Sequence, residues 1–243
     1  MNGMWLVPSR KRPHNLKRFF AALQETRTST VGYVLVNESE FEDATWRAEY
    51  LRLAPPPNWS FVLTRGDSQG DKLREVEDLY RRADWIGLLG DDQVPLTSEW
   101  DRKLLARVLG WNLVSCYDDN WQINERGGRI AGTILWSGDL YRAIGYLFPP
   151  GMHHVYIDDY LEELGQLSGC WSFAEQAVAD VVIAHLHYTR KMSDYDETYK
   201  RAYETYGDSD NSTWQQWRAN ELGAAVERVK TLINNYARVP SPI

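Results

Sequence analysis

The sequence predicts one α/β domain with a mostly parallel central sheet and C-terminal helices. Of the 243 residues 43% are hydrophobic, which is typical of a chain that folds around a core. Short apolar runs alternate with helical patterns, and no linker divides the chain. Because a helix returns the chain to the same edge of a sheet, this alternation indicates parallel strands joined by crossovers. The length suits one large domain, and two full domains would be small.

Four apolar runs in the first half predict the parallel strands, at residues 4–7, 31–36, 60–63 and 85–89. Between them, helical patterns predict helices at 13–23, 39–51 and 72–83. The first of these starts at Pro13 and carries Leu16, Phe19 and Leu23 on one face. This order of elements gives the first half its parallel sheet.

The second half is less regular but continues the same domain. Strands are predicted at 112–116, at 129–136 after a Gly127-Gly128 turn, and at 178–186. Helices are predicted at 98–109, 156–167, 194–206 and 213–236, the last two separated by residues 207–209. The single domain, 1–243, therefore has a first half of about 1–110, a second of about 111–190, and C-terminal helices over about 191–243.

Composition excludes several classes of protein. The net charge of -7 argues against a basic nucleic-acid coat protein, although a local basic patch stays open. Cys116 and Cys170 form no CxxC pair and are expected to be buried thiols in a reducing compartment. No run reaches the ~18 apolar residues of a membrane span, and the N-terminus has no signal-peptide pattern. We expect a cytoplasmic protein, in the host cytoplasm if it is viral.

Two adjacent carboxylates, Asp91 and Asp92, follow the apolar strand at 85–89. Ligands of open α/β sheets bind at the carboxyl ends of the strands. Paired carboxylates there need a counter-ion, and hard oxygen ligands suit Mg²⁺ or Mn²⁺. A solvated turn or a helix cap explains the same residues equally well. The pattern therefore leaves a metal site and a turn as alternatives.

Several short segments occur in an order that is characteristic of a known family. They are Leu6 to Pro13, Leu88 to Asp92, Pro95 to Asp101, Tyr156 to Asp158 with Leu164-Gly165, His185 to His187, and Asp196 to Tyr199. Over roughly residues 4–200 the chain resembles the family-2-like GT-A glycosyltransferases of bacteriophages and bacteria. Gln93 departs from that family, which usually has a second acid at this position of its DxD motif.

The resemblance implies a GT-A fold and a metal-dependent transfer of a sugar from a nucleotide-sugar, expected to be a UDP-sugar, to a hydroxyl acceptor. Mn²⁺ or Mg²⁺ is the implied cofactor. The first half is expected to bind the nucleotide and the second half the acceptor. A hydroxymethylated base in phage DNA is one acceptor that the resemblance implies, and a surface glycan is the other. Either stereochemical outcome is open.

The donor contacts implied by the resemblance lie after the first four strands. They are Pro8, Ser9, Arg10, Asn37, Arg65, Lys72 and Asp91. A guanidinium beside a helix N-terminus also suits a diphosphate on physical grounds. The plainer alternatives are a solvated basic turn for Arg10 and a surface loop with a capped helix for Arg65 and Lys72.

The resemblance also implies the metal ligands and the base. Asp92 is expected to bind the metal together with His187, which is the nearer of the two histidines to the following loop, with His185 as second choice. A structural histidine is the alternative. Asp158, at the start of the helix at 156–167, is the expected general base, with Asp159 and Glu162 as reserves. A helix cap is its alternative.

Trp136 and His154 are the expected acceptor contacts, although core packing explains a strand tryptophan as well. Two other functions compete with a glycosyltransferase. A nucleotidyltransferase needs a glycine-rich first loop, and residues 8–13 contain no glycine. A binding module without catalysis, holding a sugar or a nucleic acid, remains a hypothesis.

Overall fold

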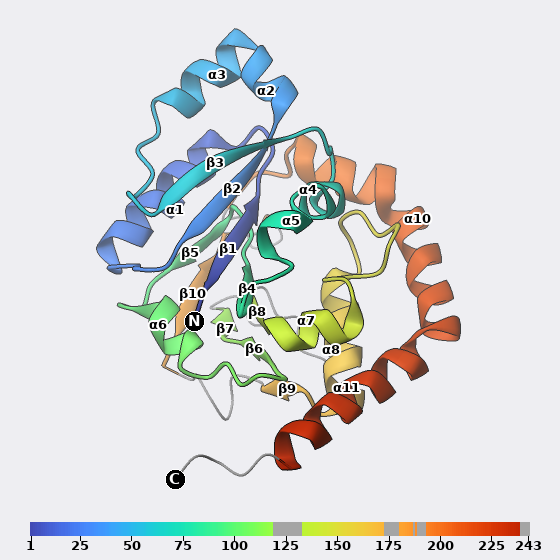
Figure 1. The fold of residues 1–243 in the computed structure, drawn as a ribbon. Coiled ribbons are helices and arrows are strands. Elements are labelled where there is room, and N and C mark those ends of the chain that lie inside the picture. The colour runs from blue at the N-terminus through green and yellow to red at the C-terminus, as the bar shows by residue number, and fades with distance from the viewer. Residues whose placement is uncertain (119–132, 173–179, 187, 189–192, 239–243) are drawn as a thin grey trace.

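The middle of the molecule is a twisted sheet with helices around it (Figure 1). A computed structural model describes residues 1–118, 133–172, 180–186, 188 and 193–238. The described strands of the sheet lie in the spatial order β3 (Trp59–Thr64), β2 (Gly32–Asn37), β1 (Gly3–Pro8), β4 (Trp85–Leu88), β8 (Ile134–Ser137), β6 (Leu113–Ser115) and β9 (Trp171–Ser172). Neighbours from β3 to β4 are parallel, and β8 is antiparallel to β4 and β6. This confirms the predicted, mostly parallel α/β sheet.

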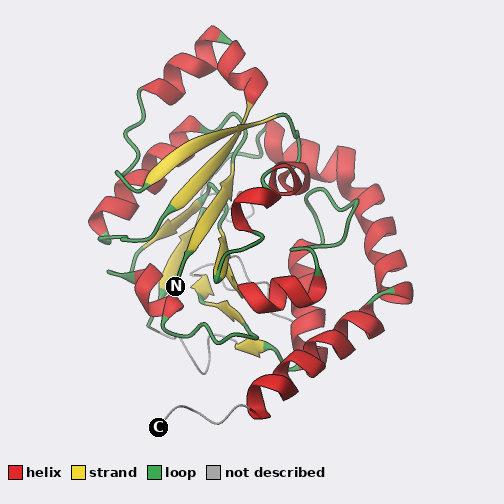
Figure 2. Ribbon diagram, viewed as in Figure 1, coloured by secondary structure: helices red, strands yellow, loops and turns green. Residues whose placement is uncertain are grey.

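Helices cover both faces of this sheet (Figure 2). The first-half helices are α1 (Pro13–Glu25), α2 (Glu38–Glu42), α3 (Ala44–Leu51), α4 (Gln69–Glu75), α5 (Glu77–Tyr80) and α6 (Trp100–Leu105). The second-half helices are α7 (Gly138–Ile144), α8 (Ile157–Ser168), α10 (Glu197–Asn220) and α11 (Leu222–Arg238). A smaller sheet places β10 (Val182–His185) between β5 (Gln93–Pro95) and β7 (Tyr117–Asp118). No described helix combines the length and apolarity needed to cross a lipid bilayer.

The side chains of β1 alternate between the two hydrophobic cores, one on each face of the sheet. Leu6 belongs to the core under α4, α7 and α8, whereas Trp5 belongs to the core under α1 and α6. Trp5 packs against Trp85 and Trp100, with ring centroids 5.7 and 4.7 Å apart. Gly87 is required in β4 because a Cβ there would collide with the Trp5 ring. Several of the tryptophans are thus core residues, which fixes the central strands.

Three helix boundaries differ from the prediction. The helix expected at 39–51 is divided at Asp43, whose carboxylate caps α3 by accepting from the N–H groups of Thr45 and Trp46. The helix expected at 72–83 is divided at Val76. The break expected at 207–209 does not occur, because α10 continues through Gly207 to Asn220. A glycine inside a helix costs only about 1 kcal/mol, and buried residues on either side of Gly207 offset it.

The remaining boundaries agree within a few residues where the chain is described. The strand expected at 129–136 falls partly, and its Gly127-Gly128 turn wholly, on residues outside the described ranges; β8 begins at Ile134. The strand expected at 178–186 is β10, over Val182–His185. Short strands carry little periodic signal, so their ends are the least predictable part of the fold.

A buried carboxylate on α10 holds the segment that precedes α8. Asp210 has 0% exposure and accepts hydrogen bonds from the backbone N–H groups of His153, His154 and Val155 at 2.9, 2.7 and 3.0 Å. The His153 ring lies 2.8 Å from the same carboxylate. Asp210 is buried and the N–H groups that it binds are partly buried, so both sides of this contact need a partner. The long C-terminal helix therefore fixes the backbone just before Asp158.

We predict that Asp210→Ala lowers the free energy of unfolding by about 3 kcal/mol, since it leaves three partly buried N–H groups without their acceptor. Urea unfolding followed by circular dichroism measures this. Glu204→Ala, at an exposed position of the same helix, is the control and should change stability by less than about 0.5 kcal/mol. Equal effects of the two substitutions would contradict the structural role of Asp210.

Candidate active site

A pocket of about 640 Å³ opens at the carboxyl ends of β1 and β4. Its floor is formed by the loops that follow these strands, one wall by residues 154–159, and the opposite wall by one face of α10. The predicted site residues that line it are Pro8, Ser9, Arg10, Lys72, Asp91, Asp92, His154 and Asp158. Residues from both halves of the chain and from the C-terminal helices thus meet at one site, where α/β sheets usually bind ligands.

Asp91 joins β4 to the loop after β1. Its carboxylate accepts from Ser9 Oγ at 2.7 Å and Arg12 Nη1 at 3.2 Å, and Asn15 Nδ2 lies 3.4 Å away. Burial raises the pKa of Asp91, the Arg12 charge opposes this, and the Asp92 charge adds to it. Both oxygens have protein partners, so Asp91 holds the loop in place and is the less available of the two carboxylates for a ligand.

Asp92 faces a histidine and a tyrosine. Its Oδ1 lies 3.5 Å from His185 Nε2, and its Oδ2 accepts from the Tyr199 hydroxyl at 2.5 Å. Burial alone would raise the pKa of Asp92, but the hydrogen bond and charge of His185, with Tyr199 and Arg12, hold it below its usual range. Asp92 is therefore a buried carboxylate that remains ionised.

Arg12, which is not among the predicted site residues, lies at the centre of these charges. Its guanidinium forms a two-point contact with Asp196, at 2.6 and 2.7 Å, and also contacts Asp91. It lies over the Tyr199 ring, 4.2 Å from the centroid, and 3.9 Å from Asp92. With 5% exposure it is a buried cation that neutralises buried anions. Asp196 and Tyr199 belong to a segment that carries the family resemblance, but no role was predicted for them.

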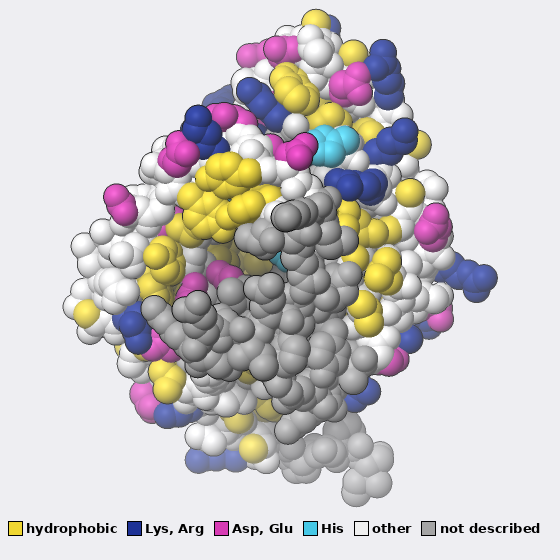
Figure 3. Space-filling view, turned by 180° about the vertical axis from the view of Figure 1, so that it is seen from behind, with side chains coloured by type: hydrophobic (Ala, Val, Ile, Leu, Met, Phe, Trp, Pro, Cys, Tyr) yellow, Lys and Arg dark blue, Asp and Glu magenta, His cyan; other side chains and the backbone are white. Residues whose placement is uncertain are grey.

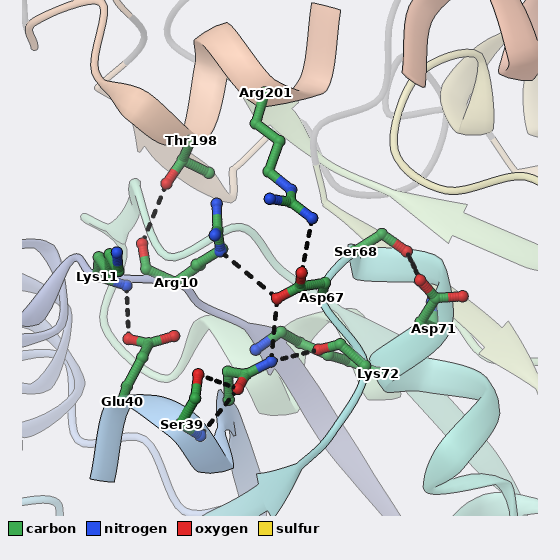
Figure 4. Close-up of polar contacts among 12 residues, drawn as sticks. Arg10, Lys11, Ser39, Glu40, Asp67, Ser68, Asp71, Lys72, Thr198 and Arg201 are labelled. Atoms are coloured by element: carbon green, nitrogen blue, oxygen red, sulfur yellow. Dashed lines mark hydrogen bonds and ion pairs between the residues drawn. The ribbon is translucent and has the colours of Figure 1, made fainter. Parts of the chain in front are cut away.

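A second polar cluster lies beside the first, where two arginines converge on Asp67 (Figure 4). Arg201 Nη2 lies 2.6 Å from Asp67 Oδ2, and Arg10 Nε lies 3.9 Å from Oδ1. Thr198 Oγ1 donates to the backbone carbonyl of Arg10 at 3.0 Å. Arg10 Nη1 is buried and finds no hydrogen-bond partner among the described residues. A buried donor in a pocket wall without a partner favours an anionic ligand there.

The loop after β1 is held by buried polar groups. Lys72 is 1% exposed and donates from Nζ to the carbonyl of Ser9 at 3.0 Å and to that of Leu35 at 3.5 Å. Burial lowers the pKa of Lys72 to about 8, and the nearby charge of Glu40 opposes that shift. Lys11 has a φ of 52°, and its N–H donates to Glu40 at 2.7 Å. Lys72 thus shapes the predicted donor loop through its backbone.

Two predicted donor residues do not line the pocket. Asn37 donates to the carbonyls of Arg65 and Gly66 at 3.2 and 3.1 Å, and its side-chain oxygen caps α2. The Arg65 side chain is 85% exposed and pairs with Glu38. Because the Asn37 amide donates to backbone carbonyls of the loop that carries Asp67, Asn37 holds that loop in shape. The Arg65 side chain points to solvent.

Asp158 and His154, the predicted base and acceptor contact, both line the wall of the pocket formed by residues 154–159. Burial raises the pKa of Asp158 to about 6, with a further contribution from the charge of Asp159. Burial lowers the pKa of His154 to about 4, with Arg12 adding to the shift, so its ring is neutral at neutral pH. Trp136, a predicted acceptor contact, has 0% exposure, packs in the core and does not line the pocket. It lies on the same face of β8 as the lining residue Ile134 but farther from the carboxyl end of β4.

A metal ion would find two protein ligands among the described residues. No group of three or more His, Cys, Asp or Glu is arranged as a metal cluster in the described part of the chain. Asp92 and His185 fit an ion that takes its other ligands from a substrate: two neighbouring ligands of an octahedral ion lie about 3 Å apart, and Mg²⁺ is commonly held by one or two carboxylates plus phosphates. The predicted ligand His187 lies outside the described residues.

Known proteins resemble the chain in structure only. No model of a protein family matches it, and no curated protein does. The mannosyltransferase PcManGT from Pyrobaculum calidifontis, solved with GDP-Man and Mn²⁺, is 10% identical with a TM-score of 0.57, over 99% of this chain and 76% of its own. The chain therefore has the GT-A fold. The expectation from the sequence is confirmed at that level.

Two further structures share the GT-A fold with the chain. TarS from S. aureus in complex with UDP is 10% identical, with a TM-score of 0.52 over 84% of this chain and 72% of its own. Glucosyl-3-phosphoglycerate synthase from Mycobacterium tuberculosis with Mg²⁺ and UDP is 11% identical, with a TM-score of 0.51 over 71% and 68%. At these identities the likeness concerns the fold, and the site must be argued from this chain's own residues.

We predict that Arg12→Met lowers the free energy of unfolding by about 3–5 kcal/mol, because it leaves buried carboxylates without their cation. Adding Asp91→Asn should restore part of that loss, since it removes one of the uncompensated charges. Urea unfolding of the single and double variants measures both effects.

Arg52→Met is the matched control, since the Arg52 side chain is 73% exposed and pairs only with Glu49 in the same helical turn. Its effect should stay within about 0.5 kcal/mol. If Asp91→Asn worsened the Arg12→Met variant, the charge argument would be wrong.

Proposed function

We propose that the protein is a metal-dependent glycosyltransferase that transfers a sugar from a nucleotide-sugar, expected to be a UDP-sugar, to a hydroxyl acceptor. The observation that carries the proposal is the pair of Asp92, after β4, and His185, at the end of β10, in a pocket that Asp158 also lines. The GT-A fold supports it, because enzymes with this fold were solved with nucleotides and Mn²⁺ or Mg²⁺. Arg10, with its unpartnered buried Nη1, supports an anionic donor.

Asp92 and His185 would hold Mn²⁺ or Mg²⁺ in this proposal. When bound, the ion offsets the negative charge that develops on the departing diphosphate. Arg10 and Arg201 stand on the same side of the pocket and add positive potential beside Asp67. In this proposal the arginines bind and orient the diphosphate, because their charges are already in position before it binds.

Asp158 is the base of an inverting transfer in this proposal. The acceptor oxygen forms a bond to the anomeric carbon, the bond from that carbon to the diphosphate oxygen breaks, and the diphosphate leaves with the electron pair. The hydroxyl proton passes to the Asp158 carboxylate. A pKa of about 6 leaves this carboxylate mostly ionised at pH 7.5 and more basic than an ordinary aspartate.

The acceptor in this proposal is a compound with a hydroxyl group. The distribution of charge on the protein surface favours one class of acceptor over the other. DNA recognition requires a surface rich in Lys and Arg. On the face drawn in Figure 3, acidic and basic side chains of the described residues are interspersed. This favours a glycan over a hydroxymethylated base in DNA, and DNA remains the hypothesis against which the glycan is tested.

We predict that UDP binds the wild-type protein in the presence of Mn²⁺ and binds at least tenfold more weakly without it. Asp92→Asn should abolish the effect of Mn²⁺, because it removes a ligand of the ion. Isothermal titration calorimetry measures both. Asp78→Asn, at an exposed position on α5, is the control and should bind as the wild type does.

Other outcomes of this titration are also decisive. Binding of GDP in place of UDP would show that the donor is a GDP-sugar and would leave the proposed glycosyltransferase activity in place. Binding that needs no metal and survives Asp92→Asn would favour a binding module without catalysis. Absence of binding for every nucleoside diphosphate, with and without Mn²⁺, would overturn the proposed function.

We predict that kcat/KM of the transfer falls as the pH drops through about 6, because protonation removes the base form of Asp158. Asp158→Asn should lower kcat by about 10²–10⁴-fold and remove this limb of the profile. Measuring the UDP affinity at each pH separates the effect of pH on the base from its effect on donor binding. An unchanged pH limb in Asp158→Asn would assign the titration to another group.

The same shift predicts a change in stability. A folded pKa above the unfolded value means that ionising Asp158 costs stability at pH 7.5, and this cost fades as the pH falls toward 4. Asp158→Asn should therefore raise Tm at pH 7.5 and raise it less at pH 5. Thermal melts at the two pH values give the answer, and a lower Tm at pH 7.5 would contradict it.

A further inference from the structure

Four tyrosine rings pack together where α10 meets the pocket. The Tyr188 ring centroid lies 4.9 Å from that of Tyr195, 4.5 Å from that of Tyr199 and 6.3 Å from that of Tyr203. Tyr195 and Tyr199 are nearly parallel, at 10° and 6.3 Å. We call these four residues the tyrosine cluster. Tyr199 and Tyr203 are one helical turn apart, so both face the pocket from α10.

The tyrosine cluster exposes aromatic surface to solvent. Tyr195 and Tyr203 are each 48% exposed. Among the described residues, Tyr236 is the one other exposed large aromatic side chain, so two of three lie in this cluster. Of the cluster, Tyr199 and Tyr203 line the pocket, and Tyr195 packs on Tyr199 beyond the lining. Exposed apolar surface that continues outward from a pocket is typical of a binding site. A tyrosine offers both a flat apolar face and a hydroxyl, which suits a ligand that is apolar on one side and polar at its edges.

The cluster connects the two chemical ends of the pocket. Tyr199 donates to Asp92, at the donor end. Tyr203 lies close enough to Asp158 to respond to its charge: burial chiefly raises the pKa of Tyr203, followed by the effect of Tyr188, and Asp158 adds to the shift. An acceptor that presents its hydroxyl between the donor and Asp158 would lie against these rings.

The charges at this end of the pocket restrict the ligand. Residues 154–159 and 202–211 contribute Asp158, Asp159 and Asp208 to the lining, and no Lys or Arg among the described residues there. Two lining cations lie beside tyrosine rings of the pocket: the Arg12 guanidinium lies over the Tyr199 ring, and Arg201 donates to the Tyr206 hydroxyl at 3.1 Å. Both are paired with acids, Arg12 with Asp91 and Asp196 and Arg201 with Asp67. Acidic side chains repel phosphate groups, which nucleic acids carry at every residue. Because the nearby cations already have acidic partners, Asp158, Asp159 and Asp208 leave this end better suited to a ligand without phosphates.

We propose that the tyrosine cluster is the acceptor subsite and binds a neutral carbohydrate, with the C–H face of a sugar ring on Tyr195 and Tyr203 and a hydroxyl directed to Asp158. The inference rests on the proposed function, since it names the acceptor class of the same pocket. Uncharged sugars match this end in both respects: they have an apolar face for the rings and hydroxyls that the acidic side chains can accept from.

The test measures binding of a panel of neutral oligosaccharides and of a 12-residue single-stranded oligothymidylate by saturation-transfer NMR and calorimetry. We expect at least one oligosaccharide to bind the wild-type protein, and Tyr203→Ala and Tyr195→Ala each to weaken it about tenfold or more. Tyr203→Phe, which keeps the ring, should retain most of the binding. Tyr236→Ala removes an exposed tyrosine on α11, outside the pocket lining, and should have no effect.

Binding of UDP with Mn²⁺ is measured on the same variants and should change less than twofold, which shows that they fold and keep the donor end. If UDP fails to bind while the oligosaccharide binds through the tyrosines, the donor proposal fails and this subsite stands. If UDP binds but no oligosaccharide does, or sugar binding ignores both alanine substitutions, the subsite is wrong. Oligothymidylate binding that depends on the tyrosines and weakens with salt would overturn it in favour of a nucleic-acid acceptor.

Discussion

The ion pairs of Arg12 are the interaction on which the rest of the site depends. Two buried carboxylates side by side would repel each other and force a proton onto one of them. Arg12 supplies a buried positive charge between Asp91, Asp92 and Asp196, and its planar guanidinium contacts several oxygens at once. Since these acids come from different parts of the chain, the requirement for charge balance also fixes where α10 lies.

The long helix α10 is therefore part of the site. Near its first turn it meets the donor end through Asp196, Tyr199 and Arg201, and further along it holds the segment before α8 through Asp210. A helix is rigid over this length, so these contacts set the spacing between Asp92 and Asp158. Enzymes gain most from catalytic groups that are held in position before the substrate arrives.

The sequence predicts the fold and the donor carboxylates because both depend on local patterns. Strand periodicity identifies β1 to β4, and the apolar run before Asp91 and Asp92 places them at a sheet edge. Arg12 and Asp196 are 184 positions apart, and no local pattern pairs them. Trp136 shows the same limit: periodicity identifies a strand residue, but only tertiary packing decides that its face is buried. Asn37 and Lys72 are predicted donor contacts, but in the structure the Asn37 amide and the Lys72 ammonium donate hydrogen bonds to backbone carbonyls.

The two ends of the pocket differ in charge, and in the proposed function this difference links catalysis to the choice of acceptor. At the donor end the arginines are close to acids and still present an unpartnered guanidinium nitrogen, so an anion is favoured. At the other end, burial raises the pKa of Asp158 to about 6, and the charge of the neighbouring Asp159 adds to that shift. If Asp158 is the base, the negative charge that adds to its basicity also disfavours an acceptor that carries phosphates. In that proposal the basicity of Asp158 and the preference for a neutral acceptor share one electrostatic contribution.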